Sequence, residues 1–104
     1  MAGYRVDISG PAENDLRDIV RYIAAQLTSP VTALNMMDAI EDAALKLSRM
    51  PKSYPPVLDD RLLSMGYRKS IVNNHVIFFT IDEKEKTVNV ERILYMRRDW
   101  RHIL

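Results

Sequence analysis

Cysteine is absent from this chain of 104 residues, so the chain can form neither a disulfide framework nor a thiolate metal site. Histidine is scarce, and His75 and His102 stand far apart in the sequence, which argues against a metal centre. The opening segment "MAGYRVDISGPAENDL" lacks the apolar stretch of a secretory signal. The apolar run "VIFF" is far shorter than the ~20 residues that span a membrane. We therefore expect a cytoplasmic protein without a metal, a small-molecule cofactor or a membrane segment.

Charge of neither sign dominates, because the formal net charge is only +1. The two signs are nevertheless unevenly spread. Residues 1–50 hold five Lys/Arg against seven Asp/Glu, whereas residues 51–104 hold ten against seven. Four of the arginines fall in the final segment, "RILYMRRDWRHIL". A basic half of this kind suits a polyanion or an acidic protein partner, although a solvated face produces the same imbalance.

The first half of the chain predicts one strand and two helices. "YRVDIS" alternates apolar and polar residues, as a half-buried strand does. Pro11 suits a first helical position, with Ser9 or Gly10 as the cap before it. The segment "TSP" separates this helix from a second one, and together they predict an antiparallel hairpin. The apolar stripe of the second helix comprises Ala33, Met37, Ile40, Ala44 and Leu47, widened by Met36, Ala43 and Met50.

The second half predicts three strands. "YRKSIV", "HVIFFTI" and "TVNVERILYM" have strand patterns, and the Asn73–Asn74 pair suits a tight turn between the first two. The three prolines within residues 51–66 predict an ordered surface connector, while "RRDWRHIL" fits either one or two helical turns or an irregular tail. We therefore predict one α+β domain over residues 1–104, with a helical hairpin on one face of a small, mainly antiparallel β-α-α-β-β-β sheet. Its core wall should include Ile71, Ile77, Phe79, Val88 and Val90.

Two motifs resemble the RelE/ParE superfamily of bacterial type II toxins. They are "NNHVIFFTID" and "VERILYMRRDW", and the similarity in element order extends over nearly the whole chain. The resemblance implies a toxin that arrests growth and is neutralised by a cognate antitoxin. One branch of the superfamily, similar to RelE, cleaves mRNA on the ribosome, and the other, similar to ParE, poisons DNA gyrase. Fold alone does not separate these mechanisms.

A nuclease that works without a metal needs a base, an acid and cations for the phosphate. If the chain is such an enzyme, the candidate catalytic residues are Arg68, His75, Tyr95, Arg97 and Arg98. His75 is the candidate base, and Arg97 or Arg98 would contact the phosphate in a bidentate manner. RelE-like nucleases usually carry an arginine near the start of the central strand, where this chain has Asn73, Asn74 and His75. This departure favours the ParE-like branch, with the nuclease and a non-toxic adaptor of the same fold as alternatives.

The same basic segment also supplies candidates for binding the target or the antitoxin. These are Lys69, Arg92, Arg97, Arg98, Trp100, Arg101 and His102. Five of them, namely Arg92, Arg97, Arg98, Trp100 and Arg101, also have a plainer explanation. Arg92 lies within an apolar strand and is expected to form an ion pair or extend to solvent. Trp100 is expected to anchor the tail on the sheet, and the arginines around Asp99 would form a solvated, partly paired tail.

Overall fold

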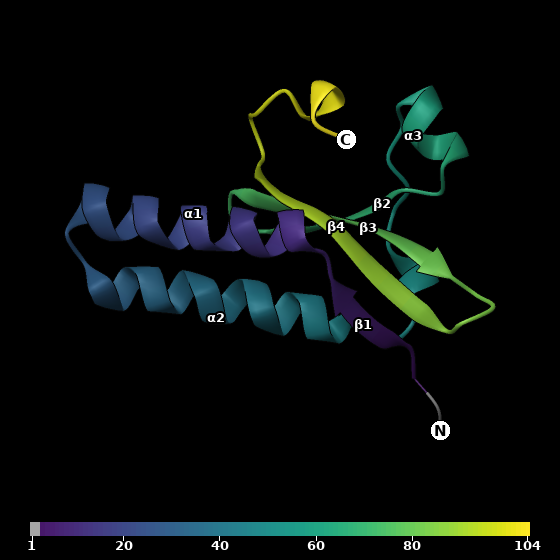
Figure 1. The fold of residues 1–104 in the computed structure, drawn as a ribbon, viewed down its shortest axis with the longest axis horizontal. Helices are drawn as coiled ribbons and strands as arrows, with labels where there is room; N and C mark the ends of the chain where they lie inside the picture. Colours follow the sequence, from purple (N-terminus) through teal and green to yellow (C-terminus); the bar gives the residue numbers. More distant parts are fainter. Residues whose placement is uncertain (1–2) are drawn as a thin grey trace.

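The computed structural model describes residues 3–104, which form an α+β fold (Figure 1). Strand β1 (Arg5–Ile8) is followed by helices α1 (Gly10–Leu27) and α2 (Pro30–Lys46). A 3-10 helix (Pro51–Ser53) and the short helix α3 (Asp60–Ser64) occupy the connector. Strands β2 (Arg68–Val72), β3 (His75–Asp82) and β4 (Thr87–Tyr95) follow, and a second 3-10 helix (Trp100–His102) lies near the end. The expected fold class and strand–helix order are confirmed, and α3 is an addition to them.

The four strands form one sheet in the order β1-β4-β3-β2. Strands β2, β3 and β4 pair antiparallel, whereas β1 lies parallel to β4. Arg5 is paired with Thr87, so the sheet joins segments from near both ends of the chain. Strand β4 contains a bulge, because Phe78 pairs with Arg92 and Phe79 pairs with Val90, which leaves Glu91 without a partner in the ladder.

Side-chain caps and prolines set the helix ends. The Ser9 hydroxyl accepts a hydrogen bond from the Ala12 amide and donates one to the Glu91 carbonyl, so this cap also ties α1 to β4. Thr28 adopts a positive φ of 46° and ends α1. Ser29 then caps α2 by accepting from the Thr32 amide, and Pro30 begins it, as the "TSP" segment predicts.

The sheet is covered on two faces by different parts of the chain. On the hairpin face, α1 and α2 bury a core that includes Ile40, Leu47, Ile77, Phe79 and Val90. On the second face, α3 and the tail cover a separate cluster. In Figure 1, α3 and the C-terminal turn lie away from the hairpin, while the hairpin extends beyond the sheet. The second cluster comprises Val57, Leu62, Tyr67, Val76, Phe78 and Leu94, with Trp100, Ile103 and Leu104 packed against it.

Two apolar residues do not lie where the sequence pattern places them. Ile71 is 58% exposed, because it pairs with Val76 on the second face of the outermost strand and does not face the helices. Met50 is 75% exposed, because it lies beyond the end of α2 at a positive φ of 49°. The predicted core positions of Ile71 and Met50 are therefore wrong, since helix and strand periodicity does not show where an element ends or which strand forms the edge.

Candidate functional site

A cleft of about 620 Å³ lies between the helical hairpin and the end of the sheet where β3 begins and β4 ends. Its helical wall includes Asp15, Asp18 and Tyr22, and its strand wall includes His75 and Tyr95. Arg98 closes the rim from the segment that follows β4. The cleft therefore joins the N-terminal helix to the basic C-terminal segment.

The two carboxylates of the cleft are already paired. Asp15 accepts two hydrogen bonds of 2.7 Å from the Arg92 guanidinium and a third, of 3.0 Å, from the Ile93 amide. The two bonds between Arg92 and Asp15 raise the pKa of Arg92, and all three bonds join α1 to β4. Asp18 pairs with Arg21 at 3.5 Å. Within residues 3–104, the Arg98 side chain has no hydrogen bond or ion pair, so the uncompensated charge at the cleft is positive.

His75 lies in the cleft wall but is only 8% exposed. Its ring meets the Tyr95 ring edge-on, with the centroids 5.8 Å apart. Its Nδ1 atom is buried and has no hydrogen-bond partner among the described residues. Burial lowers the pKa of His75 below its ordinary value of 6.5, because desolvation disfavours the charged imidazolium. Enclosure of the ring limits the access of a substrate hydroxyl to this candidate base.

Arg68 lies at the other end of the β2–β3 ladder from His75. Val72 pairs with His75, whereas Arg68 pairs with Phe79, a separation of about 13 Å along the strand at ~3.3 Å per residue. The Arg68 guanidinium donates a hydrogen bond of 2.7 Å to the Tyr54 carbonyl. Lys69 pairs with Phe78 in the same ladder. The structure thus brings together His75, Tyr95 and Arg98 and does not bring Arg68 or Lys69 to them.

The C-terminal segment divides into packed and free side chains. Trp100 packs against Phe78 with ring centroids 5.5 Å apart, as expected of an anchor. Arg101 lies over the Trp100 ring at 5.5 Å and pairs with Asp59 at 3.7 Å. His102 approaches Asp99 at 3.5 Å. By contrast, the exposed side chain of Arg97, like that of Arg98, has no ion pair or hydrogen bond within the described chain.

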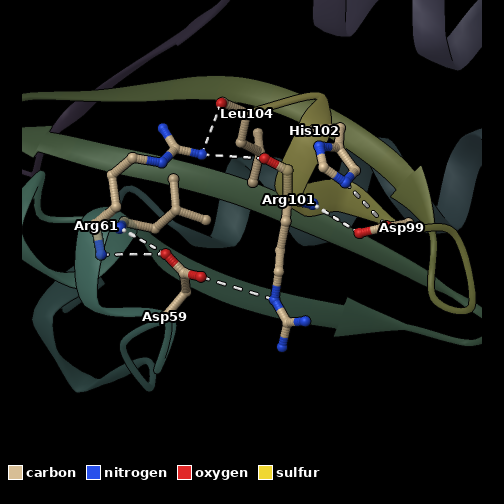
Figure 2. A network of polar contacts seen from close by, with 7 residues as sticks. Asp59, Arg61, Asp99, Arg101, His102 and Leu104 are labelled. Carbon is tan, nitrogen blue, oxygen red and sulfur yellow. Dashed lines mark hydrogen bonds and ion pairs between the residues drawn. The ribbon is translucent and has the colours of Figure 1, made fainter.

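Sequence reasoning missed the contribution of Asp59 and Arg61. Asp59 caps α3 by accepting from the Arg61 and Leu62 amides, and Arg61 donates to two main-chain oxygen atoms of the tail (Figure 2). An aspartate before a short apolar pattern is a recognisable cap signal. Nothing local in the sequence indicates the partners of Arg61, because they lie some forty residues away.

Residues 3–104 contain no group of three His, Cys, Asp or Glu side chains arranged to hold a metal ion. Over the same range, no helix has the length and apolar character to cross a bilayer.

Comparison with known proteins places these features in context. A family model described as the ParE toxin of type II toxin–antitoxin system, parDE, matches residues 6–100. The chromosomal ParDE toxin–antitoxin system from P. aeruginosa superposes with a TM-score of 0.75 at 16% identity, covering 90% of this chain and 97% of that chain. The RelBE2 toxin–antitoxin complex from Mycobacterium tuberculosis gives a TM-score of 0.64 at 20% identity, covering 89% and 98%. No curated protein matches the sequence. At these identities the two structures establish a shared fold.

Proposed function

The chain belongs to the ParE toxin family of type II toxin–antitoxin systems, and from this membership we propose that it arrests bacterial growth by binding DNA gyrase. The observation that carries the proposal is the state of the nuclease candidates. His75 is enclosed, at 8% exposure, and Arg68 is held by the Tyr54 carbonyl at the far end of the ladder. A general base must come within hydrogen-bonding reach of the proton it removes. This arrangement supports binding of a target over cleavage of RNA.

The proposed target surface is the rim formed by Arg97 and Arg98. Both side chains are exposed, and neither is paired with a carboxylate in the described residues. Free guanidinium groups on a rim suit carboxylate-rich protein surfaces, which they contact in a bidentate manner. Exposed Tyr95 stands beside them at the end of β4, at 45% of its full accessibility. Arginine beside tyrosine is a combination that interface hot spots favour.

We infer that the antitoxin segment binds in the cleft and covers the same rim. The cleft is mainly apolar, and its lining includes Ile19, Ile23 and Met36 together with the exposed Tyr22. Its carboxylates are paired, whereas Arg98 is not. An amphipathic acidic segment matches this chemistry, with apolar residues against the helical wall and carboxylates at Arg97 and Arg98. Neutralisation then follows from direct competition for these arginines.

Gyrase inhibition is tested with the purified chain in a DNA supercoiling assay. The wild-type chain should inhibit supercoiling, and the double variant Arg97→Gln/Arg98→Gln should require at least about tenfold more protein, since each lost charge-assisted contact is worth more than 1 kcal/mol. The matched control is Arg49→Gln/Lys84→Gln, which removes the same charge from exposed side chains distant from the cleft lining. Circular dichroism should show the same fold in all three proteins.

Expression in a bacterium separates the alternatives. New, codon-phased mRNA 5′ ends with normal supercoiling would establish ribosome-dependent cleavage and contradict the gyrase proposal. Tolerance of high expression, with both messages and supercoiling unchanged, would indicate a non-toxic adaptor. Altered supercoiling with intact messages is the result that the proposal requires.

A further inference from the structure

Helix α3 and the C-terminal tail are joined by a set of contacts that spans about forty residues of sequence. The Arg61 Nη2 atom donates hydrogen bonds of 3.1 Å to the main-chain oxygen atoms of Arg101 and Leu104. Figure 2 shows the Arg61 guanidinium reaching both oxygens from α3. One side chain thus fixes the backbone direction of the final turn.

Asp59 adds a second connection between the same two segments. One of its carboxylate oxygens caps α3 through the amides of Arg61 and Leu62, at 3.1 and 3.2 Å. The other lies 3.7 Å from the Arg101 Nε atom, and a dashed line in Figure 2 marks this contact. Arg101 also lies over the Trp100 ring, which packs against Phe78. We call Asp59 and Arg61 the tail clamp.

The segment that carries the free arginines is therefore fixed at both ends. At its start, the Met96 amide donates to the Asn74 carbonyl at 2.8 Å, and the Arg98 amide donates to the Tyr95 carbonyl at 3.0 Å. At its end, Trp100 is packed on the second face and the tail clamp holds the backbone after it. Arg97 and Arg98 lie between these two attachments.

We propose that Asp59 and Arg61 are positioning residues that hold Arg97 and Arg98 in the orientation that the target binds. The proposal rests on the proposed function, in which these two arginines contact the target. A loop that is ordered before binding loses less conformational entropy when it binds, so pre-organisation raises affinity without a new contact. The clamp residues themselves need not touch the target.

The exposure of the clamp side chains indicates whether they mainly position the tail or mainly stabilise the fold. The Arg101 and Asp59 side chains are 69% and 25% exposed, and Arg61 is also exposed. Exposed ion pairs contribute little to folding stability. The main consequence of the clamp should therefore be the orientation of the tail, with little change in the thermal midpoint of the protein.

Trp100 offers a direct report of tail orientation, because it is the sole tryptophan of the chain. We would compare the wild type with Arg61→Gln and Asp59→Asn, using Arg49→Gln as a matched control whose exposed side chain lies outside the clamp. Asparagine remains a good helix cap, so Asp59→Asn removes the charge pairing with Arg101 while leaving α3 capped. The measurements are acrylamide quenching of Trp100 fluorescence, gyrase inhibition, bacterial growth arrest and the thermal midpoint.

Both clamp variants should show measurably greater quenching of Trp100 and need about two- to fivefold more protein to inhibit gyrase, the range that exposed contacts allow, while Arg49→Gln behaves as the wild type. Unchanged quenching would overturn the clamp, and increased quenching with undiminished growth arrest would overturn its positioning role. If the wild-type chain arrests growth without inhibiting gyrase, only the gyrase proposal is contradicted. The growth arrest caused by the clamp variants would then still test the clamp. A wild-type chain that does not arrest growth would overturn both.

Discussion

At the scale of single residues, burial distinguishes the ion pairs on α1. Asp15 and Arg92 side chains are 9% and 24% exposed, whereas Asp18 and Arg21 are each about three-quarters exposed. A buried charge that loses its partner keeps its desolvation cost, while an exposed charge regains water. The side chain of Arg92, a predicted binding residue, is thus already paired with Asp15 of the hairpin. Its role in target or antitoxin binding stays a prediction.

Asp15→Asn should lower the free energy of unfolding by about 2 kcal/mol, less than for a fully buried pair because Arg92 retains partial exposure. Asp18→Asn should leave the stability essentially unchanged. Urea denaturation of the two variants makes the comparison. Equal midpoints for Asp15→Asn and the wild type would show that the Asp15–Arg92 pair does not stabilise the hairpin on the sheet.

His75 should make stability depend on pH. Its pKa is lowered in the folded state by burial, from an unfolded value near 6.5, so the unfolded state binds more protons as the pH falls. Stability is therefore fully present above about pH 6.5 and decreases as the pH drops toward the folded pKa. The surrounding charged and titratable groups are Asp15 and Asp18 on α1, Tyr95 on β4 and Arg98.

The variant His75→Phe removes this titration and the buried, unpaired Nδ1 atom. Its unfolding free energy should change less between pH 7.5 and 5.5 than that of the wild type, as measured by urea titrations at each pH. Glu83 does not interfere in this window, because hydrogen bonds from Tyr4, Lys52 and Lys86 lower its pKa to about 2. Parallel pH profiles for the two proteins would rule out His75 as the source of the dependence.

At the scale of elements, the two serine residues that cap the helices of the hairpin differ in the additional contacts that they make. Ser9 caps α1 and also donates to the Glu91 carbonyl at the β4 bulge. Ser29 caps α2 at the turn of the hairpin. We expect Ser9→Ala to cost about 1–2 kcal/mol and Ser29→Ala to cost about 0.5–1 kcal/mol. Thermal unfolding by circular dichroism would test the order, and a larger loss for Ser29→Ala would contradict it.

The regular elements could be predicted because their signals are local. The alternation in "YRVDIS", the Ser9–Pro11 start, the break at "TSP" and the turn at Asn73, which adopts a positive φ of 54°, all coincide with the observed boundaries within a residue or two. Trp100 as an anchor for the tail also follows from the general behaviour of a large aromatic residue near a sheet. Such predictions need information from only a few neighbouring residues.

The cluster on the second face of the sheet and the relative positions of the candidate site residues could not be predicted in this way. Burial of Leu62 and Val57 depends on their contact with the tail and with Phe78, which the connector's composition does not show. An antiparallel order of strands permits Arg68 and His75 to converge, but the register sets them at opposite ends of the ladder. Register depends on turn geometry and packing across the whole sheet.

At the scale of the whole molecule, the sheet depends on cover from both ends of the chain. Removing residues 97–104 takes away Trp100, Ile103 and Leu104, and should expose Phe78 and Leu94 on the second face. We expect the shortened chain to bind the dye ANS and to associate in gel filtration, as exposed apolar patches do. Arg97→Gln/Arg98→Gln keeps the apolar cover and should do neither. A shortened chain that stays monomeric and dye-free would show that the tail does not protect this face.

The parallel pairing of β1 with β4 has a consequence for how the protein is made. Arg5 pairs with Thr87 and Ile8 pairs with Val90. Strand β1 is synthesised first but cannot pair within the sheet until β4 has been synthesised. Contacts of such long sequence separation form late and slowly. The helical hairpin lies wholly between them and can form as soon as it emerges. During translation, therefore, the sheet stays unfinished until β4 has emerged, and the cleft proposed for the antitoxin, which needs Tyr95 and Arg98, is complete only once the segment after β4 has been made.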